Sequence, residues 1–357
     1  MPLDCFACAI RSPTPCCKTV TMLPQFTDIV GTARVVSLPL ATRFRSLDTR
    51  EALLFEGPRG WSEFSPFVEY DDAEAAAWLA AGIDFAWAPE PEQRRSSIRV
   101  NATLPAVGVA EVAAVLARFG ACRTVKVKVA ERGQVLADDV ARVAEVRRLL
   151  GPEGRIRVDA NGGWNVDEAE HAIHALAPFD LEYVEQPCAT VEELAEIRTR
   201  VSYMGVPIAA DESVRKAADP LAVARAGAAD LLVIKAQPLG GVAAAARLVA
   251  AAGLPAVVSS ALDTSIGLSM GLHLAATLPE LDYDCGLGTA ALLAADVTDE
   301  PLLPIDGALE VRRVTPSGVL LQKHAASEER TDWWLARLRR VWDRLEADRL
   351  SSEEPCD

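Results

Sequence analysis

From about residue 97 to about residue 286 the sequence repeats one pattern. A short run rich in β-branched residues is followed by a few polar, Gly or Pro residues and then by an Ala- and Leu-rich stretch. The first part of each repeat predicts a strand and the last part a helix, so the strands pair in parallel with helical crossovers between them. Strands are expected at 98–104, 124–129, 155–160, 181–186, 207–212, 231–236, 256–261 and, with a weaker signal, 281–286.

Eight strand–helix units at a spacing near 26 residues predict a TIM-type barrel. A doubly wound open sheet is the structural alternative, but no Gly-rich phosphate-binding turn follows the first strand. The predicted fold class is therefore α/β, with a barrel that spans residues 97–299. Helices between the strands are expected at 135–150, 166–177, 190–199 and 240–252.

The chain on either side of the barrel predicts further parts. Residues 26–96 give strands followed by a helix, the pattern of a separate α+β domain. The segment 300–321 is expected to complete this domain, with a further strand and hairpin at 307–321. Residues 1–25 are expected to be a disordered leader, with Met22 as an alternative first residue. In residues 322–357, apolar side chains at helical spacing predict an amphipathic helix that docks on its own chain or on a partner. These side chains are Trp334, Leu338, Val341 and Leu345.

The charge of the chain limits its partners. A net charge of −15 argues against nucleic-acid binding, which needs a basic face, but it permits a small carboxylate substrate in a locally positive site. No run of about eighteen apolar residues marks a membrane span, and the first residues lack the apolar core of a signal peptide. We therefore expect a cytoplasmic protein, and the sequence does not predict its oligomeric state. The crowded cysteines of the leader are expected to be reduced thiols, with a zinc site as the alternative. They are Cys5, Cys8, Cys16 and Cys17.

Three acidic residues recur at the repeat length. Asp159, Glu185 and Asp211 are each 26 residues apart, which places them at equivalent points near the C-terminal ends of three adjacent strands. TIM barrels carry their active sites at that end. Converging carboxylates repel one another unless a cation lies between them. Ligation by oxygen alone, without His or Cys, favours Mg²⁺ over zinc, with Mn²⁺ as a substitute.

Three lysines are expected to point into the same space. Lys126 and Lys128 lie two apart in the run "KVKV" and so share one face of the second strand. Lys235 lies near the end of the sixth strand, which stands opposite the second in a ring of eight. Lys128 and Lys235 would flank a substrate held at the metal, with Lys128 as the general base. The predicted chemistry is removal of a proton α to a carboxylate, with the metal stabilising the resulting enolate-like oxygens.

These residues also have structural interpretations. A single acid at a strand end can cap the helix that follows, and a single lysine can serve as an ion-pair partner. The stretch "SSALDTSIGL" at 259–268 precedes a helix, so its hydroxyl and N–H groups either hold a carboxylate or simply cap that helix. His171 and His174 have the spacing of a metal pair, but they are expected on the solvated face of an outer helix.

Five motifs together resemble the enolase superfamily: "KVKV", "RVDANGGW", "VEQP", "ADES" and "VIKAQPLGG". The resemblance runs from about Phe26 to Leu321 and implies an N-terminal capping domain over a (β/α)₇β barrel, a modified TIM barrel whose last unit is incomplete. Within the superfamily, the stretch from "SLPLATRF" to "DAEAAAWL" and the stretch "VSSALDTSIGL" are most similar to the o-succinylbenzoate synthase family. This similarity implies a hydro-lyase of menaquinone biosynthesis that dehydrates 2-succinyl-6-hydroxy-2,4-cyclohexadiene-1-carboxylate.

The resemblance also implies roles for positions of this sequence. Asp159, Glu185 and Asp211 would bind Mg²⁺. Lys128 would take the α-proton and then protonate the leaving hydroxyl, which gives syn elimination of water. Lys235 would stabilise the enediolate from the other face.

Neighbouring residues would support these groups. Asn161 and Glu212 would sit behind the ligands, and the capping-domain loop 43–45 would close over the substrate. Lys126, deeper than Lys128, would neutralise the metal-bound carboxylates. Residues that would orient the substrate are Arg157, Ser259, Ser260 and, more weakly, Gly286.

Some features depart from the family pattern and leave other functions open. The cysteine-rich leader and the Trp-rich tail lie outside it, and Asp282 and Asp284 bring negative charge near the eighth strand, where a dianionic substrate would prefer none. A racemase or epimerase of N-acylamino acids or dipeptides, with the same metal and lysines, is the alternative function, and a muconate-type cycloisomerase is a more distant one. A non-catalytic barrel would require the loss of a ligand or a lysine, and none of them is missing.

Overall fold

The computed structural model describes residues 23–45, 47–216 and 219–353. Residues 1–22, which hold most of the predicted leader with its cysteines and Met22, lie outside these ranges.

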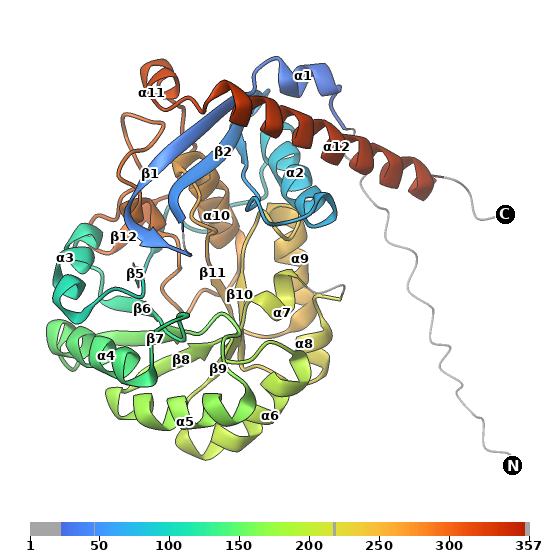
Figure 1. Ribbon diagram of the computed structural model, residues 1–357. Helices are drawn as coiled ribbons and strands as arrows, with labels where there is room; N and C mark the ends of the chain where they lie inside the picture. The colour runs from blue at the N-terminus through green and yellow to red at the C-terminus, as the bar shows by residue number, and fades with distance from the viewer. Residues whose placement is uncertain (1–22, 46, 217–218, 354–357) are drawn as a thin grey trace, which may run out of the picture.

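Parallel strands, each paired with the next in chain order from β5 to β11, form a curled sheet at the centre of the molecule (Figure 1). Of the eighth predicted strand, only two residues pair with the sheet. Cys285 bridges to Val100 on the β5 side, and Gly286 bridges to Ser259 just after β11. The N–H of Asn101 donates to the backbone oxygen of Cys285 at 2.9 Å, which joins the two ends of the sheet. The predicted barrel with an incomplete last unit is therefore confirmed, and the open sheet is excluded. The strands are β5 (Ala102–Leu104), β6 (Thr124–Lys128), β7 (Arg155–Asp159), β8 (Leu181–Glu185), β9 (Ile208–Ala210), β10 (Leu231–Ile234) and β11 (Ala256–Val258).

Helices cover the outside of this barrel (Figure 1). The helix after β11, α10, differs from the others because every residue from Ser265 to Ala276 is buried: it lies between the barrel and the first domain. In the described ranges, no helix is both long enough and apolar enough to cross a membrane. The helices are α3 (Val112–Leu116), α4 (Leu136–Leu150), α5 (Val166–Leu176), α6 (Val191–Val201), α7 (Glu212–Arg215), α8 (Ala222–Arg225), α9 (Val242–Ala252) and α10 (Ser265–Thr277).

The first predicted barrel strand, 98–104, is divided in the structure. Its beginning forms β4 (Ser97–Arg99), which pairs antiparallel with β12 (Ala308–Glu310) in a separate small sheet. Only its end, β5, joins the barrel.

The prediction of a hairpin at 307–321 is wrong. After β12 the chain forms a helix, α11 (Gly318–Lys323), instead of a second strand. Pro316 has no N–H to donate to a strand ladder, and the N–H of Ser317 bonds to a loop carbonyl, so pairing cannot continue there.

The first domain caps the barrel. Its antiparallel sheet lies over the C-terminal ends of the barrel strands, with the β1–β2 hairpin reaching toward them (Figure 1). Residues just beyond the predicted 300–321 extend this sheet: Ala325 bridges to Val36, and the N–H of Ser37 donates to His324 at 2.9 Å. The elements of this capping domain are α1 (Phe26–Val30), β1 (Arg34–Phe44), β2 (Leu47–Gly57), β3 (Gly60–Phe64) and α2 (Asp72–Trp87).

The helix at the end of the chain, α12 (Glu328–Glu353), packs on α2 of its own chain. Trp334, Leu338 and Val341 are fully buried at this contact, as their spacing predicts. The ring of Trp334 packs edge-on against Phe64 of β3, with ring centroids 5.9 Å apart. The helix therefore docks on its own chain, the first of the two expectations for it.

Candidate active site

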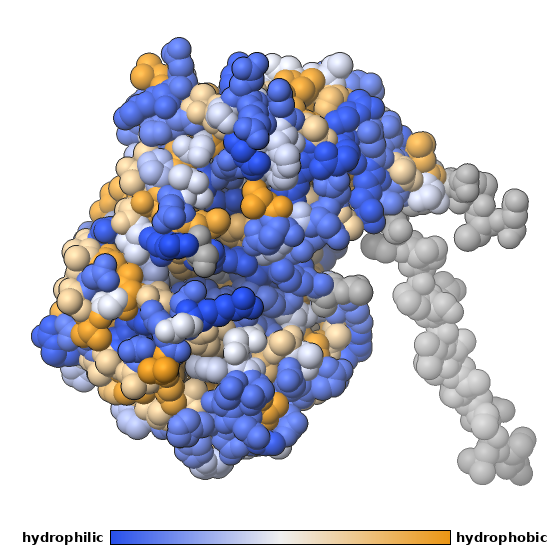
Figure 2. Space-filling view, viewed as in Figure 1, coloured by the Kyte–Doolittle hydropathy of each residue, from blue (hydrophilic) through white to orange (hydrophobic). Residues whose placement is uncertain are grey.

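Two neighbouring hollows lie where the capping domain meets the barrel. The inner cavity, about 40 Å³, sits at the C-terminal ends of the barrel strands beneath the β1–β2 hairpin. The outer chamber, about 490 Å³, lies between residues 41–45 of the hairpin and the loop 105–108. Phe44 and Lys128 line both, so the chamber leads toward the cavity past these side chains. Figure 2 shows mainly hydrophilic residues where the capping domain and the barrel meet on this face.

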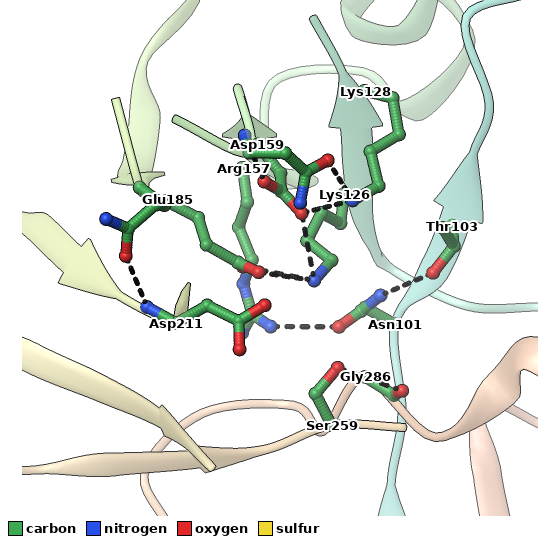
Figure 3. A network of polar contacts seen from close by, with 12 residues as sticks. Asn101, Thr103, Lys126, Lys128, Arg157, Asp159, Glu185, Asp211, Ser259 and Gly286 are labelled. Carbon is green, nitrogen blue, oxygen red and sulfur yellow. Dashed lines mark hydrogen bonds and ion pairs between the residues drawn. The ribbon is translucent and has the colours of Figure 1, made fainter. Parts of the chain in front are cut away.

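The three predicted carboxylates lie near one another, and those of Asp159 and Asp211 line the inner cavity (Figure 3). Asp159 ends β7 and is paired in register with Glu185 at the end of β8, while Asp211 directly follows β9. Parallel pairing sets Asp159 and Glu185 side by side, whereas the partner of Glu185 on β9 is Ala209, so Asp211 lies two residues beyond that level. All three side chains are at most 3% exposed.

Each carboxylate has one of the three predicted lysines as its nearest ion-pair partner, and Asp159 also lies 3.6 Å from Nζ of Lys126. Two of these lysines come from β6, and the third follows β10, four strands away in the sheet order and so across the barrel. The deepest of them, Lys126, places Nζ 2.9 and 3.0 Å from the two oxygens of its partner. The pairs are Lys126 with Glu185, Lys128 with Asp159 and Lys235 with Asp211.

Burial and ion pairing together set the charges of this site. Burial raises the pKa of Glu185 to about 7, and the neighbouring carboxylate of Asp159 adds to that shift while Lys126 opposes it. Burial acts on Asp159 in the same direction, but Lys128 and Lys126 outweigh it and hold that pKa below its usual range. Burial lowers the pKa of Lys235 more than nearby acids raise it. The charged form of the middle carboxylate, Glu185, is therefore disfavoured, because the lysines do not fully offset its burial and the charge of Asp159.

This donor set has the chemistry of a site for a hard divalent cation. The three acidic residues offer carboxylate oxygens, which are the ligands that Mg²⁺ takes in proteins. They offer no sulfur or nitrogen ligand. The raised pKa of Glu185 marks a position where a further positive charge is favourable. In the described ranges, no three Asp, Glu, His or Cys side chains lie close enough together to hold a metal ion as they stand. The three carboxylates form ion pairs with lysines instead.

Sequence reasoning missed two residues that hold Asp211. Gln186, with a left-handed φ of 39°, accepts the backbone N–H of Asp211 at 2.9 Å and that of Ser213 at 3.2 Å. Arg215, almost fully buried, places Nε 3.0 Å from the carboxylate of Asp211. Signals for both were present, because Gln186 belongs to the motif "VEQP" and Arg215 stands four residues after Asp211, on the same side of α7.

Asn161 and Glu212 lie where the supporting residues were expected. Asn161 accepts a hydrogen bond from Lys128 at 2.7 Å and donates one to Glu212 at 3.2 Å. Glu212 in turn is paired with Arg215 at 2.6 Å. These bonds connect the lysine of β6 to the residues that hold Asp211.

The predicted substrate contacts Ser259, Ser260 and Gly286 line the inner cavity. The hydroxyls of both serines donate to the backbone oxygen of Gly286, at 3.4 and 3.0 Å. A side chain at Gly286 would collide with Ser259, since an added Cβ would lie 2.5 Å from its Oγ. These residues form one wall of the cavity, and their contact with a substrate stays a prediction.

Arg157, the fourth predicted substrate contact, does not line the inner cavity. It shares a face of β7 with Asp159 but lies one layer nearer the N-terminal ends of the strands, and it is fully buried. It donates to Glu182 at 2.5 Å, to Asn101 at 3.0 Å and to the backbone oxygen of Asp284 at 2.6 Å. Arg157 ties barrel strands together beneath the site, and its contact with a substrate stays a prediction.

Asp284, His171 and His174 do not line the inner cavity. Asp284 is bonded to Arg99 at 2.8 Å and to Thr124 at 2.6 Å, so its charge is paired beneath the site. His171 and His174 are exposed on the outer helix α5, as their solvated-face interpretation predicts.

The segment 259–268 caps a helix. Thr264 accepts the N–H of Ile266 at 3.1 Å, and Glu63 of the capping domain accepts the N–H groups of Thr264 and Gly267 at 3.2 and 3.1 Å. The N-terminus of α10 therefore already holds a carboxylate, one that belongs to this chain.

The sequence matches known protein families over most of its length. Residues 108–319 match the description Enolase C-terminal domain-like, and residues 35–86 match Enolase N-terminal domain-like. An o-succinylbenzoate synthase of Mycobacterium leprae is 53% identical over 325 residues, which cover 91% of this chain and 95% of that protein. One of Thermobifida fusca is 55% identical over 320 residues, which cover 89% of this chain and 99% of that protein.

Solved structures with the same fold are more distant in sequence. A muconate lactonizing enzyme from Pseudomonas putida is 21% identical with a TM-score of 0.69, over 82% of this chain and 98% of that one. An N-succinyl Arg/Lys racemase from Bacillus cereus is 18% identical with a TM-score of 0.68, over 83% of this chain and 97% of that one. At this identity they show the shared fold alone. The sequence matches show that the chain belongs to the enolase superfamily, in which its sequence groups with the o-succinylbenzoate synthases.

Proposed function

We propose that this chain is a hydro-lyase that dehydrates 2-succinyl-6-hydroxy-2,4-cyclohexadiene-1-carboxylate to o-succinylbenzoate, in menaquinone biosynthesis and in the cytoplasm. The choice of substrate rests on the 53% and 55% identity to o-succinylbenzoate synthases over most of the chain. The observation that carries the chemistry is the placement of Lys128 and Lys235 on opposite sides of three buried carboxylates.

The carboxylates of Asp159, Glu185 and Asp211 would hold Mg²⁺, or Mn²⁺ in its place. When bound, the ion supplies positive charge against the negative charge that develops on the substrate carboxylate. Lys126 stays bonded to Glu185 and offsets part of the carboxylate charge. Arg215 fixes the orientation of Asp211 from behind.

Lys128 is proposed as the general base. Its side chain is 13% exposed and lines both hollows, so it can reach a substrate that enters through the outer chamber. As a neutral amine it takes the proton from the carbon α to the carboxylate, and the electron pair of the C–H bond passes into the enediolate. As an ammonium it then gives a proton to the hydroxyl on the neighbouring carbon. The electron pair of the enediolate forms the new ring C=C bond as the C–O bond breaks, and the C–O electrons leave with the water. Because one residue serves both steps, the proton and the hydroxyl leave from the same face.

Lys235 is proposed to stabilise the enediolate from the opposite face. Its bond to Asp211 holds the ammonium at the wall of the inner cavity. Hydrogen bonds from an ammonium to developing oxyanions are charge-assisted, and they strengthen as the negative charge grows. Lys235 would therefore act most strongly at the transition state.

The test incubates the purified protein and Mg²⁺ with the cyclohexadiene carboxylate and follows the aromatic product by absorbance. A second arm offers N-succinyl amino acids and follows their chirality, because two lysines on opposite faces also suit a racemase or epimerase. Dehydration in the first arm supports the proposal. Racemisation without dehydration would replace it with the racemase alternative, and inactivity in both arms would reject it.

A further inference from the structure

A second, smaller cavity lies directly behind Lys235. This rear cavity has a volume of about 10 Å³, and Lys235, Ser259 and Ala261 line both it and the inner cavity. The remaining polar side chains in its lining are Gln237, three residues beyond the end of β10, and Asp263, two residues before α10.

These two side chains present polar atoms without partners. Gln237 is 3% exposed, and neither its Nε2 nor its Oε1 makes a hydrogen bond. Asp263 is 6% exposed, and its Oδ1 makes none. Buried polar atoms in folded proteins are nearly always bonded to protein or to ordered water, because an unmade bond leaves their desolvation uncompensated. The unpartnered atoms therefore point to an occupant of the rear cavity.

Size and chemistry select water as that occupant. A volume of about 10–15 Å³ is the least that holds one water molecule, and a buried water needs two to four polar partners. A cation is disfavoured by the ammonium of Lys235 in the same wall, and an apolar occupant would leave the polar atoms unpaired. One water can serve Asp263, one amide atom of Gln237 and Lys235 together.

We propose that a buried water occupies the rear cavity and that Gln237 and Asp263, which hold it, are positioning residues for Lys235. The ammonium has three N–H donors, and one of them goes to Asp211. With a second donor on the water, the third is left to point into the inner cavity, where the enediolate would form. The kinetic part of this inference rests on the proposed function, whereas the presence of the water does not.

The capping domain fixes the segment that carries Asp263. Arg50 of β2, only 3% exposed, donates to the backbone oxygens of Leu262 and Ala261 at 3.1 and 3.4 Å. Leu262 has a left-handed φ of 62°, a conformation that persists only where its surroundings hold it. The water would thus be the last link between the capping domain and Lys235.

The first test is a crystal structure of the protein, at a resolution that shows ordered water. We expect a water within hydrogen-bond distance of Gln237 and Asp263. A dry cavity, or direct bonds between the two side chains, would overturn the proposal whatever the substrate proves to be.

The second test compares variants. In Gln237→Leu, of similar size without polar atoms, we expect the water to be lost and kcat to fall about tenfold with KM within about twofold, the effect of a misplaced catalytic group. Asp263→Asn keeps an oxygen that can accept a hydrogen bond from the water, so it should retain the water and the wild-type kcat. Asp263→Leu should lose the water and show the same fall in kcat as Gln237→Leu. Gln93→Leu, on an exposed loop, is the control. Loss of the water with unchanged kcat would refute the positioning role, as would an equal fall in kcat for Asp263→Asn.

Discussion

Replacing Asp263 by Asn tests how two buried carboxylates at the capping interface affect stability. Glu63 is completely buried. Burial raises its pKa to about 7, and the charge of Asp263 is the second cause of that shift. Burial also raises the pKa of Asp263, against the opposing charge of Arg50. The substitution removes one of two like charges and keeps the shape of the side chain.

The size of the effect follows from the shift. A pKa raised from 4.5 to about 7 corresponds to about 3 kcal/mol of lost stability above pH 7, at about 1.4 kcal/mol per unit. Burial is the larger cause, so we assign about 1 kcal/mol to Asp263. Removing the buried charge of Asp263 itself adds a smaller gain. We therefore expect Asp263→Asn to raise the free energy of unfolding by about 1–2 kcal/mol at about pH 8.

The pH dependence has a definite sign. Between about pH 4.5 and 7 the folded protein binds more protons at Glu63 than the unfolded chain does, so this group makes stability fall as the pH rises. In Asp263→Asn the pKa of Glu63 is lower, so the fall is smaller. Urea unfolding followed by circular dichroism at about pH 5 and about pH 8 measures both effects, with the exposed Asp282→Asn as control. A variant no more stable than the wild type at the higher pH would refute the reasoning.

Three other outcomes are expected. EDTA should abolish turnover and Mg²⁺ should restore it in the absorbance assay, and full activity in EDTA would contradict the metal site. Lys126→Met leaves the buried carboxylate of Glu185 without its closest cation, so urea unfolding should show a loss of about 3–5 kcal/mol, and a loss near zero would contradict this pairing. Trp334→Ala removes a fully buried ring between α12 and the capping domain and should cost about 3–5 kcal/mol by the same method. A wild-type midpoint would mean that α12 adds little to the capping domain.

The positions of the candidate ligands could be predicted because they follow the barrel's own repeat. Residues 26 apart on β7 and β8 occupy the same level, which brought Asp159 and Glu185 together in register. On β9 the partner of Glu185 is Ala209, so the same spacing places Asp211 two residues further toward the C-terminal end. Side-chain alternation likewise set Lys126 one layer below Lys128. The same rule places Arg157, two residues before Asp159, one layer down.

Contacts without such a period could not be predicted. Glu63 and Thr264 are 201 residues apart in the chain, and no spacing relates the capping sheet to the loop before α10. The rear cavity depends on the same long-range packing. The division of the first strand into β4 and β5 also depends on a distant partner, because β12 takes the residues of β4 into another sheet.

The proposed function depends most on Lys128 as the base of a dehydration reaction. Its most direct test is the turnover of the cyclohexadiene carboxylate by Lys128→Ala, measured with Mg²⁺ beside the wild type and beside Lys323→Ala, an exposed lysine. We expect wild-type turnover in Lys323→Ala and a fall of about 10²–10⁴ in Lys128→Ala, with an unchanged circular dichroism spectrum. Near-wild-type turnover by a folded Lys128→Ala would contradict the account.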